Sequence, residues 1–181
     1  YVNTELDNDL SAKIYDAYLD NLDPSKSYLL RSDIDEFEPY RFKLDNALRS
    51  GNLAPAFEIF NRYHERVTNR MEIVIHQLES EFDAFDFELS EQLLVDRELA
   101  HWASTQKELD DLWRKRLKDA ILNLKLTDKE PVKIQELLVK RFKNRLARTQ
   151  QTNAEDVFQL YMNSFTNTYD PHTQYFSPRT S

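Results

Sequence analysis

The sequence contains a single glycine, Gly51, among 181 residues. Tight β-hairpin turns need residues that accept positive φ angles, and one glycine can supply very few of them. A chain of this length can bury a core without a disulfide or a structural metal. It also has no cysteine, which excludes disulfides, thiolate metal sites and a cysteine nucleophile. We therefore predict an all-α, multi-helix domain.

Apolar residues recur at helical spacing along most of the chain. From Leu53 to Leu78 they alternate steps of four and three, which predicts a long central helix from about Pro55 to Ser80. Proline is tolerated in the first turn of such a helix, which would be about 39 Å long. The other predicted stripes follow the same spacing. They are Leu6-Leu10-Ile14-Tyr18-Leu22, Leu109-Leu112-Trp113-Leu117-Ile121-Leu124, Ile134-Leu138-Phe142-Leu146 and Val157-Tyr161-Phe165.

Punctuating residues predict where these helices begin and end. Asp23-Pro24 ends the first helix, because proline disfavours the α conformation in the residue before it. Ser32 is the expected N-cap of the next helical region and Gly51 its C-terminal stop. Pro39 lies inside that region and predicts a kink or two shorter helices. The last two helices are expected to be capped by Thr127 or Asp128 and by Asn153.

Residues 81–103 lack a clear period. Phe82, Phe85 and Phe87 stand among acidic residues, so we interpret the stretch as an irregular excursion pinned by its aromatic rings. It is the place in the chain where a short strand or an irregular arm is expected.

The C-terminal segment, residues 167–181, has two prolines, an adjacent aromatic pair at Tyr175-Phe176 and no helical period. We predict that it is a junction after a helical domain spanning residues 1–166. Tyr169-Asp170-Pro171 should end the last helix, and the Asp170 carboxylate can cap the following turn. An extended strap should follow. The junction motif consists of Asp170, Pro171, His172, Thr173, Tyr175, Phe176 and Pro178.

A second segment, Asp23-Pro24 followed by Tyr28, repeats the pattern D-P-x-x-x-Y of the junction motif. Because Asp-Pro is favoured in turns, the repeat indicates either two equivalent helix-ending turns or chance.

No catalytic or metal site is predicted. His172 stands near Asp170 and Thr173, but turn capping explains that proximity better than a catalytic triad. "HERVT" at His64 begins like a zinc-protease helix but has Thr68 where the second histidine should stand. His64 lies on the apolar seam and is expected to be a core residue. We expect no cofactor.

Charge is unevenly distributed. Residues 1–100 hold 10 Lys and Arg against 22 Asp and Glu, whereas residues 101–181 hold 14 against 10. The basic runs "RKRLK" at 114–118 and "KRFKNRLAR" at 140–148 could contact an anionic partner. This leaves an independent helical binding module as the alternative function. A solvated helix face pairing with the acidic half is the preferred interpretation, and no nucleic acid is expected as a partner.

Three stretches resemble the amino-terminal region of bacterial tail-specific protease, the carboxyl-terminal processing protease. They are "YLDNLDPSKSYLLRSDIDEFE" (18–38), "ELDDLWRKRLK" (108–118) and "QTNAEDVFQLYMNSFTNTYDPHTQYFSPRTS" (151–181). The last stretch is the most specific. The chain opens on Tyr1 rather than methionine, so we expect it to be a piece of a longer protein.

The resemblance implies a noncatalytic domain of a periplasmic serine endopeptidase, attached to or near the inner membrane. In that family a helical domain precedes a PDZ domain and a core with a serine nucleophile and a lysine base. None of these catalytic residues lies in this chain, because all would follow Ser181. The resemblance implies a scaffold or vault wall. Its partners would be its own PDZ and protease domains, substrates with apolar carboxyl-terminal tails and, in some members, a lipoprotein adaptor.

Overall fold

The computed structural model describes residues 8–169 and 173–176, with the side chains of Asp45 and Tyr169 excepted. The all-α prediction is confirmed: in these residues the structure has seven α-helices and no named strand. Two short 3₁₀ turns interrupt the chain. The helices are α1 (Asn8–Leu22), α2 (Arg31–Phe37), α3 (Leu44–Ser50), α4 (Ala54–Ser80), α5 (Gln106–Lys125), α6 (Pro131–Gln150) and α7 (Ala154–Tyr169); the 3₁₀ turns are η1 (Glu38–Tyr40) and η2 (Phe82–Ala84).

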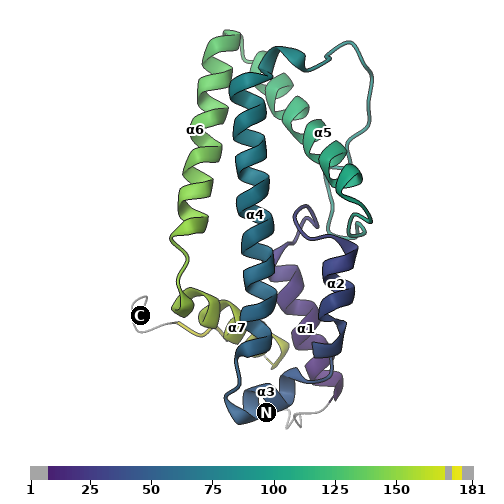
Figure 1. Ribbon diagram of the computed structural model, residues 1–181, viewed down its shortest axis with the longest axis vertical. Helices are drawn as coiled ribbons and strands as arrows, with labels where there is room; N and C mark the ends of the chain where they lie inside the picture. The colour runs from purple at the N-terminus through teal and green to yellow at the C-terminus, as the bar shows by residue number, and fades with distance from the viewer. Residues whose placement is uncertain (1–7, 170–172, 177–181) are drawn as a thin grey trace.

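The predicted long central helix is α4, which has 27 residues and carries Pro55 in its first turn. It runs the length of the molecule, with α6 antiparallel beside it and α5 on its other side (Figure 1). Helices α1, α2, α3 and α7 gather around the N-terminal half of α4. A helix this long cannot be covered by a single neighbour, so it connects two groups of helices.

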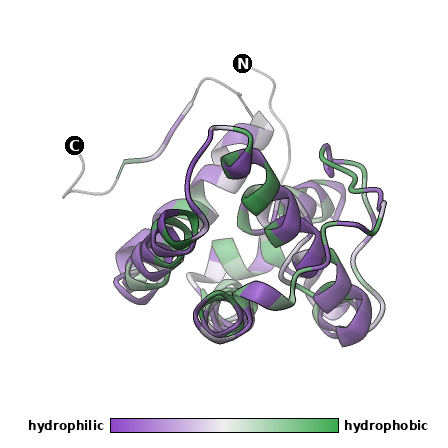
Figure 2. Ribbon diagram, turned by 90° about the horizontal axis from the view of Figure 1, so that it is seen from above, coloured by the Kyte–Doolittle hydropathy of each residue, from purple (hydrophilic) through white to green (hydrophobic). Residues whose placement is uncertain are grey.

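Each group of helices has its own hydrophobic core. One core joins the C-terminal half of α4 to α5 and α6 through residues such as Met71, Trp113 and Ile134. The other joins the N-terminal half of α4 to α1, α2, α3 and α7 through residues such as Tyr18 and Ile59. Seen along the long axis, hydrophobic and hydrophilic residues occupy different sides of the helices (Figure 2), as amphipathic packing requires.

Several predicted helix ends are confirmed. Helix α1 ends at Leu22, directly before Asp23-Pro24. Gly51 terminates α3 at φ 69°, in the left-handed conformation that glycine adopts without a Cβ clash. Pro39 lies in η1, between the two short helices that were expected around it. The Asn153 side chain accepts hydrogen bonds from the backbone N–H groups of Glu155 and Asp156, which caps α7.

Two predicted caps are wrong. Ser32 lies inside the first turn of α2, because the chain enters that helix from Leu30, whose N–H donates to the Asp33 carboxylate at 2.9 Å. Thr127 and Asp128 do not cap α6, which begins at Pro131. Instead, the Thr127 hydroxyl donates to the carbonyl of Leu124 at 2.7 Å and closes the end of α5. At the start of α2 and at the end of α5, the side chains of Asp33 and Thr127 form these hydrogen bonds with the backbone.

The predicted irregular excursion is confirmed for residues 81–103. Apart from η2, it follows no regular structure, and its end meets the rest of the fold through one isolated parallel bridge between Leu30 and Ala103. The Arg31 N–H donates to the Ala103 carbonyl there at 2.8 Å. None of the described helices is long and apolar enough to cross a bilayer.

A buried ionic group holds α2 against α4. The Asp33 carboxylate is 1% exposed and pairs with Arg62 and Arg66 of α4, each at 2.8 Å. Burial acts to raise the pKa of this carboxyl, but hydrogen bonds from Arg66, the Leu30 amide and Arg62 outweigh burial and lower it. Asp33 therefore caps α2 and docks it at the same time.

We predict that Asp33→Ala lowers the free energy of unfolding by about 3 kcal/mol, because it leaves the partly buried Arg66 guanidinium without its carboxylate and Arg62 with Glu36 alone. Urea unfolding followed by circular dichroism measures the change. Asp35→Ala is the matched control, since Asp35 is exposed and, among the described residues, forms an ion pair only with exposed Arg31; it should cost less than about 1 kcal/mol. Equal losses in the two variants would contradict the docking role of Asp33.

Candidate interaction surface

The turn after α1 is organised by a buried carboxylate. Asp23 is fully buried and accepts hydrogen bonds from the backbone N–H groups of Ser27, Tyr28 and Leu29 at 2.9, 2.9 and 3.0 Å. Burial raises the pKa of the Asp23 carboxyl, and the three amide bonds and the charge of Arg116 oppose that rise. Pro24 is exposed at the outside of the turn. The structure thus gives this turn motif an architectural role.

Tyr28, the third residue of the turn motif, enters the core between α4, α5 and α6. Its ring makes an edge contact with Tyr63 at 5.9 Å and a tilted contact with Trp113 at 5.4 Å, measured between ring centroids. The Arg145 guanidinium lies over the same ring at 5.4 Å. Burial raises the pKa of Tyr28 to about 12. Its hydroxyl is buried and has no hydrogen-bond partner among the described residues.

Only part of the predicted junction motif can be placed, because Asp170, Pro171, His172 and Pro178 lie outside the described residues. Thr173 and Phe176 are exposed. The backbone N–H of Tyr175 donates to the Asn163 side chain of α7 at 2.6 Å, and its ring packs edge-on against Phe158 of α7 at 5.4 Å. Tyr175 therefore ties the described part of this segment to α7. The path of the segment toward a further domain remains a prediction.

The irregular segment 81–103 lies over α5 and is fixed at its first part by aromatic packing. Phe82 is buried, and Phe85 and Phe87 are partly buried against the core of α4, α5 and α6. The Lys125 ammonium lies 3.7 Å from the ring centroid of Phe87, close enough for a cation–π contact. The three phenylalanines singled out in the sequence therefore anchor the segment.

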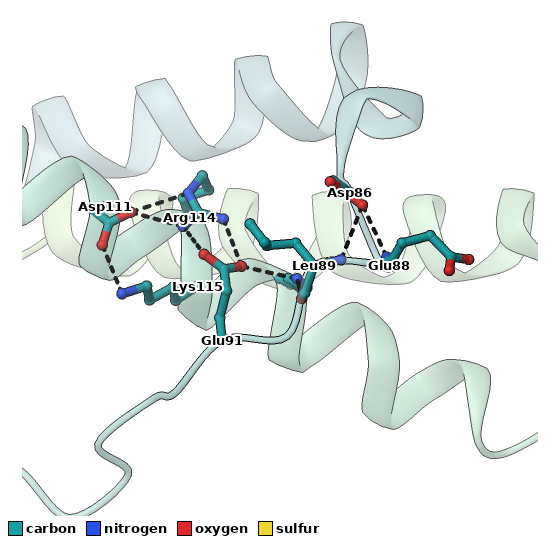
Figure 3. Close-up of polar contacts among 8 residues, drawn as sticks. Asp86, Glu88, Leu89, Glu91, Asp111, Arg114 and Lys115 are labelled. Carbon is teal, nitrogen blue, oxygen red and sulfur yellow. Dashed lines mark hydrogen bonds and ion pairs between the residues drawn. The ribbon is translucent and has the colours of Figure 1, made fainter.

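Ionic contacts fix the next part of the segment, as Figure 3 shows. The Glu91 carboxylate pairs with both Arg114 and Lys118 of α5, and the Lys118 ammonium lies 2.9 Å from a Glu91 oxygen. Lys118 also donates to the Leu89 carbonyl at 2.5 Å. Hydrogen bonds from Arg114 and Lys118 lower the pKa of Glu91 to about 2. We call the contacts of Glu91 with Arg114 and Lys118 the Glu91 clamp. Before it in the sequence, the Asp86 side chain accepts hydrogen bonds from the backbone N–H groups of Glu88 and Leu89 and turns the backbone.

The last part of segment 81–103 is tied to the turn after α1. Arg97 donates from Nε to the Ser25 carbonyl at 2.9 Å, and the Lys26 ammonium donates to the Glu98 carbonyl at 2.5 Å. These contacts join residues about seventy positions apart in the sequence. The turn and the segment therefore form one surface at the side of α5.

Although it is anchored at both ends, the segment exposes a row of large apolar side chains. Leu94, Val95 and Leu99 are 58%, 84% and 92% exposed, and Leu89 is 52% exposed. Exposed apolar side chains gathered on one ordered loop are typical of a contact surface. Sequence reasoning missed them. The available signal was the apolar run Leu93-Leu94-Val95, which has no helical period and lies between acidic residues.

The other residues considered for catalysis, metal binding or an anionic partner make contacts within the fold. His64 contacts the Thr149 carbonyl of α6 at 3.0 Å through Nε2 and lies beside Phe60. Among residues 8–169 and 173–176, no group of three or more His, Asp or Glu side chains could hold a metal ion. In the basic run of α6, Phe142 is buried and Leu146 partly buried, whereas Lys143 pairs with Glu79 of α4 at 2.5 Å.

Comparison with known proteins gives a matching family model and similar curated proteins. Residues 1–179 match the family model described as the tail-specific protease N-terminal domain. The chain is also 40% identical over 182 residues to a tail-specific protease from Haemophilus influenzae. That match covers 100% of this chain and 26% of the relative, so the chain spans about a quarter of the relative's length.

We predict that the Glu91 clamp weakens in acid. Because the pKa of Glu91 is lower in the fold than its ordinary value of 4.5, the clamp contributes stability above about pH 4.5 and loses it as the pH falls toward about 2. The urea midpoint of Glu91→Gln should therefore lie below that of the unmodified chain at neutral pH, and the difference should shrink in acid. Glu88→Gln, which alters an exposed carboxylate of the same segment without an ion pair among the described residues, should show no such pH-dependent difference. A Glu91→Gln difference that is constant with pH would contradict the clamp.

Proposed function

Because the chain belongs to the family of tail-specific protease N-terminal domains, we propose that it is a noncatalytic helical scaffold of a periplasmic serine endopeptidase. The parent enzyme would process or degrade proteins from their carboxyl-terminal region. Its serine and lysine would follow Ser181, in the part of the relative that this chain does not match. The chain would then serve as a wall of the enzyme and as a surface for partners or substrates.

The observation that carries this proposal is the exposed apolar row on an anchored loop. Segment 81–103 is held by aromatic packing and by the Glu91 clamp, yet it presents Leu94, Val95 and Leu99 to the outside. Ordering a loop costs conformational entropy, and leaving its apolar side chains in water recovers little of that cost. A contact partner for this row accounts for both features.

The proposed partners are of three kinds. The chain's own PDZ and protease domains would dock on the helical body, and substrates with apolar tails would be accommodated beside them. A lipoprotein adaptor near the inner membrane would be a further partner. The elongated body, built on a single 27-residue helix, suits a wall because it offers faces along its whole length.

An independent binding module for an anionic partner is the second candidate. The observation in its favour is the set of exposed cations on α6, which includes Lys140, Arg141 and Arg148. Titration of the isolated chain against anionic vesicles and against nucleic acid at two salt concentrations tests it. Electrostatic binding weakens steeply with salt, so the absence of salt-sensitive binding removes this candidate.

We predict that the isolated chain is folded and helical but does not cleave a peptide with an apolar carboxyl-terminal tail, whereas the parent enzyme does. Circular dichroism and a fluorogenic peptide assay measure the two properties. Cleavage by the isolated, homogeneous chain would overturn the noncatalytic role.

We predict that replacing Leu94, Val95 and Leu99 together by serine in the parent enzyme lowers kcat/KM for a protein substrate at least several-fold. Thermal stability should change little, because these side chains are exposed. The matched control replaces Leu126 and Val132, which are also exposed and apolar but lie between α5 and α6 and at the start of α6. Equal effects of the two sets, or no effect of the first, would contradict a contact role for the segment.

A further inference from the structure

Three arginines from three separate elements converge on the turn after α1. Arg97 of segment 81–103 donates to the Ser25 carbonyl at 2.9 Å, and the Arg116 guanidinium of α5 lies 3.5 Å from the Ser25 hydroxyl. Arg145 of α6 lies over the ring of Tyr28, three residues further on. The guanidinium groups of Arg97 and Arg116 therefore both contact Ser25, and that of Arg145 adds a third positive charge near the same turn.

In the described part of the chain their positive charges are offset only partly, by the charge of Asp23 acting on Arg116. Within 4.0 Å of Arg97, Arg116 or Arg145 there is no carboxylate of a described residue. Other arginines differ in this respect: Arg31, Arg41, Arg62, Arg66, Arg70 and Arg114 each pair with an Asp or Glu. The nearby buried acid, Asp23, already accepts three backbone amides.

The stacking of these arginines leaves hydrogen-bonding capacity unused. Arg116 lies over Trp113 at 4.7 Å and Arg145 over Tyr28 at 5.4 Å, and these ring contacts require no N–H donor in the guanidinium plane. The N–H groups lie on the edge of that plane and suit a carboxylate. Burial lowers the pKa of Arg116, and the charges of Arg145 and Arg97 add to that effect, whereas Tyr28 and Asp23 oppose it. An added anion would relieve this repulsion.

A pocket of about 180 Å³ lies directly beside Arg97 and Arg116. Its remaining wall is largely aliphatic, from Leu93, Leu94 and Val95, with Ser25 and Asp119 completing it. Asp119 is exposed and accepts a hydrogen bond from Asn123, so its charge lies at the α5 side of the pocket. The volume is too small for a cofactor but admits one side chain. Two cationic donors beside an aliphatic wall match a carboxylate carried on a short aliphatic stem.

We propose that this pocket binds an acidic side chain of a partner protein segment, with Arg97 and Arg116 holding the carboxylate and Leu94 and Val95 contacting the neighbouring apolar residues. The inference rests on the proposed role of segment 81–103 as an interaction surface and names the chemistry of its partner. Arg145 contributes to the field that attracts the anion but does not line the pocket. The occupant is a protein segment because Leu94 and Val95, which line the pocket, are themselves exposed and can contact apolar residues on either side of the carboxylate.

Calorimetric titration of the chain with three short peptides tests the source of the carboxylate. The first is acetylated and amidated and carries one Glu between two Leu residues, the second replaces that Glu by Gln, and the third carries Gln and a free C-terminal carboxylate. We expect the Glu peptide to bind at least tenfold more tightly than the Gln peptide, with an affinity that falls as salt is added. Equal binding of the first two peptides, no binding of the Glu peptide, or binding of the third alone would overturn the proposal.

Substitutions then locate the site. Arg116→Gln should weaken binding of the Glu peptide about tenfold, because it removes a charge-assisted hydrogen bond. Arg145→Gln should weaken it less, and Arg141→Gln, an exposed arginine on the same helix α6, should leave it unchanged. If Arg116→Gln lowers the melting temperature, Arg97→Gln provides the second test. Unchanged affinity in both Arg97→Gln and Arg116→Gln would place the carboxylate elsewhere.

The two proposals can fail separately. Loss of processing in the Leu94, Val95 and Leu99 variant of the parent, without discrimination between the peptides, would retain the contact surface and overturn the acidic-residue site. Peptide discrimination with unchanged processing would retain the site and overturn the role of the surface in the enzyme.

Discussion

The fold depends on one constraint, which is that the apolar stripe of a 27-residue helix must be covered along its whole length. Helices α5 and α6 cover its C-terminal half, and four shorter helices cover its N-terminal half. Covering the two halves separately produces two cores in one chain. Tyr63 of α4 packs against both cores, so α4 links them mechanically as well as in sequence.

Buried charges then set how the shorter elements meet α4 and α5. Asp33 fixes α2 through two arginines of α4, and Asp23 fixes the turn that sends Tyr28 into one core and Leu29 into the other. Each carboxylate also satisfies backbone amides, so loss of either would leave buried donors without an acceptor. The acidic character of residues 1–100 is thus partly structural and not only a property of the solvated surface.

The most informative departure from regular packing is segment 81–103. It is held by phenylalanines, by a glutamate between two cations, and by backbone carbonyls that accept from Arg97 and Lys26, and still it exposes apolar side chains. An anchored surface of this kind is suited to contact with a partner, because little further ordering is needed on binding. The arginines beside it add a preference for negative charge.

The sequence by itself determined the helical class, the long central helix, the ends of α1, α3 and α7, and the family resemblance. Glycine scarcity, apolar periodicity and capping residues are properties of the sequence itself, most of them of short stretches, so they can be recognised without a structure. Only the tertiary structure decided where α2 and α6 begin, the course of segment 81–103 and the convergence of Arg97, Arg116 and Arg145. The Arg116–Ser25 contact, for example, spans 91 positions in the chain. Such contacts depend on how separate helices pack, and no local pattern of residues specifies that packing.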